Sequence, residues 1–191
     1  MNNRRSFIVG IKSIRLSKKE KIFLKKYKPW GVILFTRNIK SIKQTSNLTS
    51  SIRKIFKDKH YPILVDQEGG RVNRLKKIIS FDNLTSEFFG NKFTSNFKEF
   101  VFFYKLFVDK TSYLLKSAGI NINTSPVLDL RIKGTSNIIG DRSYSKDPKI
   151  VSKIGDYCIE YFHKNGIGTV IKHIPGHGLA KVDSHDFPPV V

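Results

Sequence analysis

Short runs of β-branched and aliphatic residues alternate along this chain with longer amphipathic stretches, and this alternation limits the possible folds more than any other feature. The short runs lie at residues 7–11, 31–35, 63–65, 120–123 and 169–173. Residues 31–35 are apolar apart from the glycine, as expected for a strand that is buried on both faces. Because strands that alternate with helices form parallel sheets with right-handed crossovers, the pattern predicts an α/β fold.

The stretches between these runs carry the signals that begin and end helices. Capping boxes at 17–20 and 41–44 predict two helix starts, and an aspartate followed by proline at 147–148 predicts a third. A further helix is expected before Gly119, which can end it in the left-handed conformation. Its helically spaced apolar residues, which we expect in the core, are Phe100, Phe103, Phe107, Leu114 and Ala118.

Five parallel strands fit either a doubly wound sheet or part of a (β/α)₈ barrel. The sequence contains neither GxGxxG nor GxxxxGK[ST] after a strand, which disfavours nucleotide binding. Polar clusters instead begin at Asp66, Asn123 and Lys172, where the third, fourth and fifth strands are expected to end. Barrel enzymes build their sites at that rim. We therefore favour a barrel, with residues 1–191 as a single domain, although the alternation alone leaves the doubly wound sheet open.

The formal net charge of +20 is the one total that suggests a different function, because strongly basic proteins can bind nucleic acid. The 35 lysines and arginines are scattered over every segment, and no basic run alternates with stacking aromatic residues. We therefore expect a solvated basic surface and no nucleic-acid partner. Binding of DNA or RNA stays open as an alternative.

Cysteine usage and hydropathy bear on the compartment. A single cysteine, Cys158, excludes an internal disulfide and is typical of a reducing environment. The N-terminus has a basic start but too short an apolar run for a secretory signal, and no stretch is long enough to span a membrane. We expect a cytoplasmic protein without a membrane partner.

Two of the polar clusters offer carboxylates and guanidinium groups for binding. Asp66 follows a buried strand and could accept hydrogen bonds from two neighbouring sugar hydroxyls, while the glycines at 69–70 would let the backbone approach a ligand. Arg71 and Arg74 supply planar donor forks. Arg142 lies in a long loop, a position that is often functional. On spacing alone, an ordinary turn with an Asp–Arg pair and a structural salt bridge of Arg142 are competing interpretations.

The densest cluster holds three of the five histidines within thirteen residues. A metal site is disfavoured, because the backbone is rich in glycine and proline, the spacing is irregular and Lys172 would repel a cation. Acid/base chemistry fits better, since Asp183 could hold the imidazole of His185 and raise its basicity. A histidine satisfied at the surface is the alternative.

Six sequence blocks follow one another along nearly the whole chain. They read GVILFTRN at 31–38, VDQEGGR at 65–71, SPVLD at 125–129, IGDRS at 139–143, KHIPGHG at 172–178 and DSH at 183–185. In order and spacing, these blocks resemble the bacterial β-N-acetylglucosaminidases of glycoside hydrolase family 3. The resemblance implies a (β/α)₈ barrel, of which this chain would supply the N-terminal part with about five strands.

The same resemblance implies a cytoplasmic hydrolase of peptidoglycan recycling that needs no cofactor and no metal. Its substrate would be a small molecule, a muropeptide from which it removes the non-reducing terminal N-acetylglucosamine. By position, His185 would be the proton donor and acceptor and Asp183 its activating partner, in place of the usual acid/base carboxylate. Arg71 and Asn123 would support the site. The residues that would bind N-acetylglucosamine are Asp66, Arg74, Arg142, Lys172 and His173.

One departure from the family pattern concerns the nucleophile. Members carry an aspartate nucleophile late in the chain, and Asp186, the last aspartate here, follows the His185 loop directly. Retaining hydrolysis requires a nucleophile to form the glycosyl-enzyme intermediate. We therefore expect the 191 residues to be an incomplete barrel that is inactive alone. A non-catalytic half-barrel that binds N-acetylglucosamine is the alternative.

Overall fold

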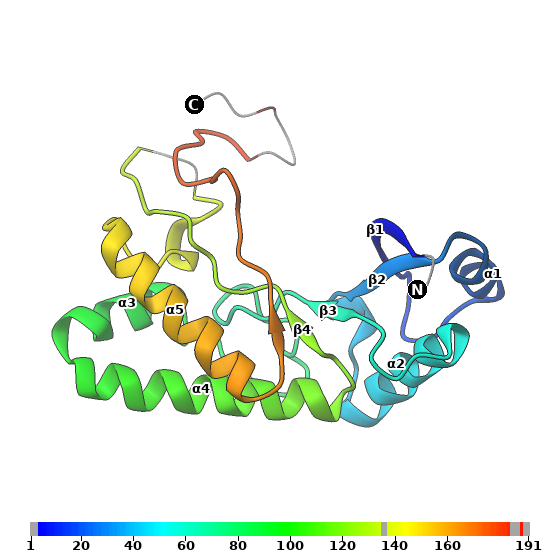
Figure 1. Ribbon diagram of the computed structural model, residues 1–191. Coiled ribbons are helices and arrows are strands. Elements are labelled where there is room, and N and C mark those ends of the chain that lie inside the picture. Colours follow the sequence, from blue (N-terminus) through cyan, green and yellow to red (C-terminus); the bar gives the residue numbers. More distant parts are fainter. Residues whose placement is uncertain (1–3, 135–136, 184–187, 189–191) are drawn as a thin grey trace.

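The computed structural model describes residues 4–134, 137–183 and 188, and these residues form a parallel sheet flanked by helices (Figure 1). Strands and helices alternate as the sequence predicts. In chain order the elements are β1 (Arg5–Gly10), α1 (Lys18–Tyr27), β2 (Pro29–Leu34), η1 (Thr36–Asn38), α2 (Ile42–Phe56), β3 (Ile63–Val65), α3 (Ser86–Ser95), α4 (Phe97–Ser117), β4 (Ile122–Asn123), η2 (Gly140–Arg142), α5 (Pro148–Lys164) and β5 (Gly168–Thr169).

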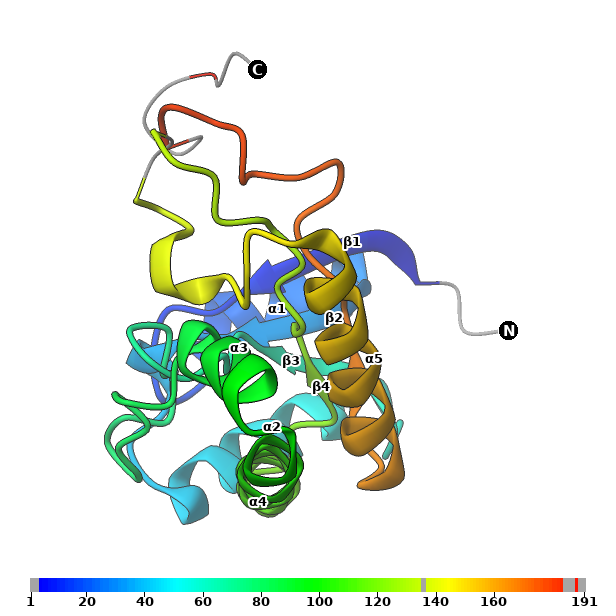
Figure 2. The same cartoon turned by 90° about the vertical axis from the view of Figure 1, so that its left-hand side faces the viewer.

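The strand order decides between the two predicted sheet types. The five strands lie in the order β1-β2-β3-β4-β5, and each pairs in parallel with the next. A doubly wound sheet reverses its strand order at a switch point, whereas a barrel adds strands in one direction. Successive helices also contact one another, α1 with α2, α2 with α4, and α4 with α5. The chain therefore has the arrangement of about five strands of a (β/α)₈ barrel (Figures 1 and 2).

The core lies between the sheet and the helices. Val32, Ile63 and Val65 on the strands are fully buried, and so are Ile52 of α2 and Ile154 of α5. An aromatic cluster continues this core between α3, α4 and α5, with its rings in T-shaped, tilted or stacked contact. Its members are Phe89, Phe93, Phe100, Tyr104, Phe107 and Tyr157.

The predicted helix ends are confirmed where local chemistry sets them. Ser17 and Glu20 form the capping box of α1, and Asp147 caps α5 with Pro148 in its first turn. Gly119 follows α4 with a φ of 73°, the left-handed conformation that glycine adopts without a Cβ clash.

Two sequence predictions about the fold are wrong in detail, and one helix was not predicted. Phe103 was expected in the core but is 42% exposed, because α4 turns Tyr104 and Phe107 inward and Phe103 to the flank. Strands β4 and β5 are two residues long, shorter than the predicted runs. The sequence signals also missed α3, whose Gly90 packs so tightly against Tyr144 that a Cβ would lie 1.7 Å from its carbonyl oxygen.

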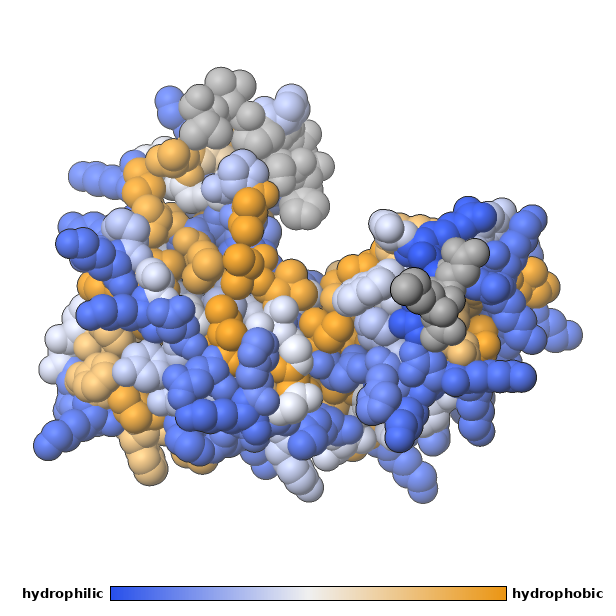
Figure 3. Space-filling view, viewed as in Figure 1, coloured by the Kyte–Doolittle hydropathy of each residue, from blue (hydrophilic) through white to orange (hydrophobic). Residues whose placement is uncertain are grey.

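The two ends of the sheet are open among the described residues. Strand β1 pairs with β2 and strand β5 pairs with β4, and apolar side chains at both edges are exposed. In the space-filling view, the surface is hollowed above the strands, and hydrophobic residues lie beside the hollow (Figure 3). The exposed apolar residues are Ile8 on β1, Trp30 on the adjacent β2, and Val170 and Ile171 directly after β5, with exposed fractions near 40%.

Candidate functional site at the carboxyl ends of the strands

The site begins where β3 and β4 end side by side. Val65 pairs with Asn123, so the next residues, Asp66 and Thr124, are neighbours, and the Thr124 hydroxyl donates to the Asp66 carboxylate. The Asn123 carboxamide bonds both backbone groups of Gln67, accepting from its N–H at 2.9 Å and donating to its C=O at 2.9 Å. Asn123 therefore holds the loop after β3 in place and has its polar atoms occupied by that loop.

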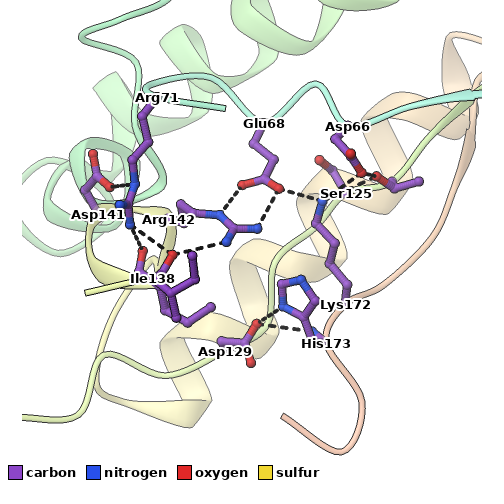
Figure 4. A network of polar contacts seen from close by, with 12 residues as sticks. Asp66, Glu68, Arg71, Ser125, Asp129, Ile138, Asp141, Arg142, Lys172 and His173 are labelled. Atoms are coloured by element: carbon purple, nitrogen blue, oxygen red, sulfur yellow. Dashed lines mark hydrogen bonds and ion pairs between the residues drawn. The ribbon is translucent and has the colours of Figure 1, made fainter. Parts of the chain in front are cut away.

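The loop after β3 turns back on itself through two glycines in left-handed backbone conformations. Gly69 has a φ of 95° and Gly70 a φ of 52°, and a Cβ on Gly69 would lie 2.2 Å from the Leu84 carbonyl oxygen. Because other residues are strained or excluded there, the turn requires glycine. This turn leaves the side chain of Glu68, the residue before it, buried in the network shown in Figure 4.

Glu68 is the centre of that network. Its Oε2 accepts from Arg142 Nε at 2.8 Å and its Oε1 accepts from Arg142 Nη2 at 3.0 Å. Lys172 Nζ lies 2.5 Å from the same Oε1. Burial raises the pKa of Glu68, but the hydrogen bond from Arg142 and the charge of Lys172 outweigh it and lower the pKa overall. Glu68 is thus an ionised carboxylate between two cations.

Asp66 joins this network from the other side of Lys172. Its Oδ1 lies 3.3 Å from Lys172 Nζ, and its Oδ2 lies 3.4 Å from Arg74 Nη2. Burial raises the pKa of Asp66, but Lys172, the Thr124 hydroxyl and Arg74 lower it more. Its side chain keeps 19% exposure, against 3% for Glu68. Asp66 is therefore the more accessible of the two carboxylates.

His173 is held by a third carboxylate. Its Nδ1 lies 2.5 Å from Asp129 Oδ2, which also accepts from the His173 backbone N–H at 3.1 Å. The other Asp129 oxygen accepts from the backbone N–H of His177. Burial raises the pKa of Asp129, but these bonds from His173 and His177 lower it overall. Since Asp129 occupies Nδ1, the ring's Nε2 is the nitrogen that a ligand could use.

Segments that follow β4 and β5 carry these residues and run together above the strands (Figure 1). Leu128 donates its N–H to the Lys172 carbonyl at 2.6 Å, and Lys172 donates to the Pro126 carbonyl at 3.1 Å. Lys172 and His173 therefore lie beyond the end of β5, three and four residues after Thr169, and are placed by this second stretch of parallel pairing.

The structure separates the predicted residues into two roles. Asp66, Arg74, Arg142, Lys172 and His173 are brought together at the rim. Arg71 has a structural role, because it pairs with Asp141 at 2.9 Å and donates to three backbone carbonyls of residues 137–139.

The predicted Asp183–His185 pair stays a prediction. Asp183 is among the described residues, whereas His185 and Asp186 lie outside them. No group of three or more His, Cys, Asp and Glu side chains within the described ranges could hold a metal ion. None of the helices described is long and apolar enough to cross a membrane.

Sequence reasoning missed Glu68, Thr124 and Asp129 as members of the site. All three lie inside or beside the six blocks, but their partners are distant along the chain. Glu68 and Arg142 are 74 residues apart, and Asp129 and His173 are 44 residues apart. The signal that could have indicated Glu68 and Asp129 is a carboxylate in a block at a strand end, as for Asp66, and for Thr124 it is a polar residue directly after a strand.

The family model described as "Glycosyl hydrolase family 3 N terminal domain" matches residues 7–191. The chain belongs to glycosyl hydrolase family 3. A curated relative, the "Beta-hexosaminidase" of Hydrogenovibrio crunogenus, is 37% identical over 81% of this family 3 chain and 43% of its own length. The family 3 chain thus spans about half the length of the curated relatives it matches.

Solved structures of other family 3 members superpose closely. Native NagZ from Neisseria gonorrhoeae is 28% identical, with a TM-score of 0.82 over 97% of this chain and 54% of its own. The same enzyme in complex with N-trifluoroacetyl-D-glucosamine is 29% identical, with the same TM-score and coverage. These likenesses confirm the predicted family and the predicted barrel fold.

Proposed function

We propose that this chain supplies the sugar-binding half of a β-N-acetylglucosaminidase that removes terminal N-acetylglucosamine from muropeptides during peptidoglycan recycling in the cytoplasm. The observation that carries the proposal is that the five residues expected to bind N-acetylglucosamine lie together at the strand ends, where ion pairs join Asp66, Arg74, Arg142 and Lys172 and Asp129 holds His173. Figure 4 shows Asp66, Arg142, Lys172 and His173 of this group. Support also comes from the similar NagZ structure whose bound molecule is N-trifluoroacetyl-D-glucosamine, an analogue of that sugar.

The network has the chemistry that a neutral, hydroxyl-rich ring requires. Asp66 presents acceptor oxygens, Arg74 and Arg142 present the guanidinium N–H groups that their carboxylate partners leave over, and His173 presents its Nε2. These groups are already held by partners, so little side-chain entropy is lost when a sugar binds. In this proposal they fix the sugar ring so that its anomeric carbon and glycosidic oxygen face the segment after residue 178.

Proton transfer is assigned to the segment that follows. His185 gives a proton to the leaving oxygen while the C1–O bond breaks and a carboxylate bonds to C1. His185 then takes a proton from the water that releases the sugar, and Asp183 stabilises the imidazolium. The attacking carboxylate would come from the rest of the barrel, beyond the five strands described.

The open side of the sheet supports the assignment of the attacking carboxylate to a part of the barrel beyond these five strands. An apolar groove of about 700 Å³ lies between α5 and the segment after β5, and Ile174 and Leu179 on its wall are 75% and 58% exposed. Parallel barrel strands are normally paired on both sides and covered by helices. We assign the groove and the β5 edge to the remaining strands and helices of the barrel.

The test is turnover of 4-nitrophenyl N-acetyl-β-D-glucosaminide by the full polypeptide that the gene encodes. We expect His185→Ala to lower kcat at least about 100-fold, because general acid–base catalysis contributes roughly that much. His163→Ala, on the outer helix α5, is the control and should turn over substrate at the wild-type rate. Unchanged turnover in His185→Ala would remove His185 from the mechanism, and no turnover by the wild type would refute the proposed function.

A further inference from the structure

Glu68 differs from Asp66, the acidic residue two positions before it, in the groups that its side chain can contact. Its side chain is 3% exposed, and both of its oxygens are occupied by Arg142 and Lys172. Asp66 is more exposed and keeps room for a ligand beside its cations. A sugar in the network would therefore contact Asp66 directly, whereas Glu68 could act on it through the two cations.

The geometry of the cations depends on Glu68. Two parallel hydrogen bonds from Arg142 fix the plane of its guanidinium group, as in other bidentate Arg–carboxylate pairs. Arg142 Nη1 donates to the Ile138 carbonyl at 3.1 Å, so each of its three nitrogens has a partner and its remaining N–H bonds have fixed directions. Lys172 Nζ is drawn toward Glu68 Oε1 while it stays 3.3 Å from Asp66 and from Thr124.

Charge gives Glu68 a second effect. Arg74, Arg142 and Lys172 bring three positive charges to a partly buried rim, and Asp66 and Glu68 bring two negative charges. Without Glu68, Arg142 and Lys172 would repel each other, and Asp66 would be the carboxylate left in contact with Lys172 and Arg74. Lys172 would then be drawn toward Asp66, the acceptor that the sugar needs.

We infer that Glu68 is a positioning residue for N-acetylglucosamine binding, which fixes the directions of the Arg142 and Lys172 donors and keeps Asp66 available for the sugar. This inference rests on the proposed function of the site. Glu68 itself makes no contact with the sugar and has no part in proton transfer. Its removal should therefore weaken sugar binding in the ground state and in the transition state alike.

The experiment compares Glu68→Gln with the wild-type full polypeptide in turnover of 4-nitrophenyl N-acetyl-β-D-glucosaminide and in calorimetric titration with N-acetylglucosamine. The amide keeps the shape but places an N–H₂ group against one of the cations. We expect KM and the dissociation constant to rise about tenfold, with kcat changed less than about threefold, as for a loss of uniform binding. A purely structural role would lower the melting temperature and leave KM unchanged.

Two further variants keep the test decisive. Glu99→Gln makes the same substitution in the ion pair with Lys92 between α3 and α4, and it should leave KM at the wild-type value. Glu68→Asp keeps the charge but is too short to reach both cations, so its KM should rise by an intermediate factor of about three. It carries the test if the Gln variant does not fold.

The outcomes separate this inference from the proposed function. Wild-type turnover with KM in Glu68→Gln within twofold of wild type would overturn the positioning role and leave the glycosidase proposal intact. A wild-type protein that neither turns over the substrate nor binds N-acetylglucosamine would overturn both. In Lys172→Met, a further Glu68→Gln change should add little, because the two residues act together.

Discussion

The rim of the sheet and its β5 edge differ in how far their chemical groups are satisfied. At the rim, buried carboxylates have polar partners: Glu68 holds the cations of Arg142 and Lys172, and Asp129 holds the His173 ring. Along the β5 edge, the exposed side chains of Val170 and Ile171 are apolar, and the neighbouring groove adds the exposed Ile174 and Leu179. The polar half of the site is thus preorganised within this chain, while the apolar surface that would support it lacks its cover among the described residues.

This difference indicates where the stability of the site comes from. A buried ion pair costs much free energy in desolvation, and it survives only when its hydrogen bonds are complete. Glu68 meets that condition, because Arg142 and Lys172, from the loops after β4 and β5, occupy both of its oxygens. Hydrophobic burial at the edge, in contrast, would need elements that are not among the five strands described.

The largest expected effect comes from removing the ion pair between Arg142 and Glu68 at the rim. Arg142→Met should lower the free energy of unfolding by about 3 kcal/mol, because it leaves the buried Glu68 carboxylate without its bidentate partner. Urea unfolding followed by circular dichroism at pH 7 measures this change. Lys105→Met is the matched control, since its i,i+4 pair with Asp109 is exposed and should contribute about 0.3–0.5 kcal/mol. Equal losses in the two variants would show that the rim pair is no more important than a surface pair.

Local rules predicted the elements of the fold better than their contacts. The buried runs and caps located all five strands and the starts of α1, α2 and α5, because these signals lie within a few residues. Helix α3 was missed because its place depends on Gly90 against the Tyr144 backbone and on Phe89 in the aromatic cluster. These packing partners are distant along the chain, so a local sequence pattern does not indicate them.

The site shows the same division. Asp66, Lys172 and His173 could be predicted because polar residues directly after buried runs meet at one rim. The competing interpretation of a structural pair was also correct in part, since Asp66 does contact Arg74 and Arg142 does form a salt bridge. Glu68 could not be predicted as the partner of Arg142, because the two residues are 74 positions apart in the sequence. They meet because the loop after β3 folds back at the two glycines.

A smaller effect is the loss of folding stability that the rim carboxylates should cause when the pH is lowered. The pKa values of Asp66, Glu68 and Asp129 are lowered: burial raises each one, but the neighbouring cations and hydrogen bonds outweigh it. These carboxylates bind a proton more weakly in the folded than in the unfolded chain. The stability they contribute is therefore complete above the ordinary carboxyl pKa of about 4 and is lost as the pH falls through the lowered folded values.

Urea unfolding at a series of pH values from 7 to 3 measures this loss. Asp129→Asn should flatten the dependence, because one of the three linked groups is then absent, whereas Asp156→Asn on the exposed face of α5 should leave the slope as it is. An unfolding free energy that rises on acidification would contradict the assignment of paired, ionised carboxylates at the rim.

The smallest effect concerns the β5 edge and decides whether the remaining barrel covers it. In the 191-residue polypeptide, Leu179→Ser should change the free energy of unfolding by less than about 0.5 kcal/mol, because Leu179 is 58% exposed. In a polypeptide of the length of the curated relatives, the same change should cost about 1–2 kcal/mol, since the leucine would be buried.

Leu106→Ser is the control, because Leu106 on α4 is 56% exposed and lies outside the groove. Urea unfolding of both variants at both lengths gives the comparison, and an equal cost of Leu179→Ser at the two lengths would show that the rest of the barrel does not cover the groove.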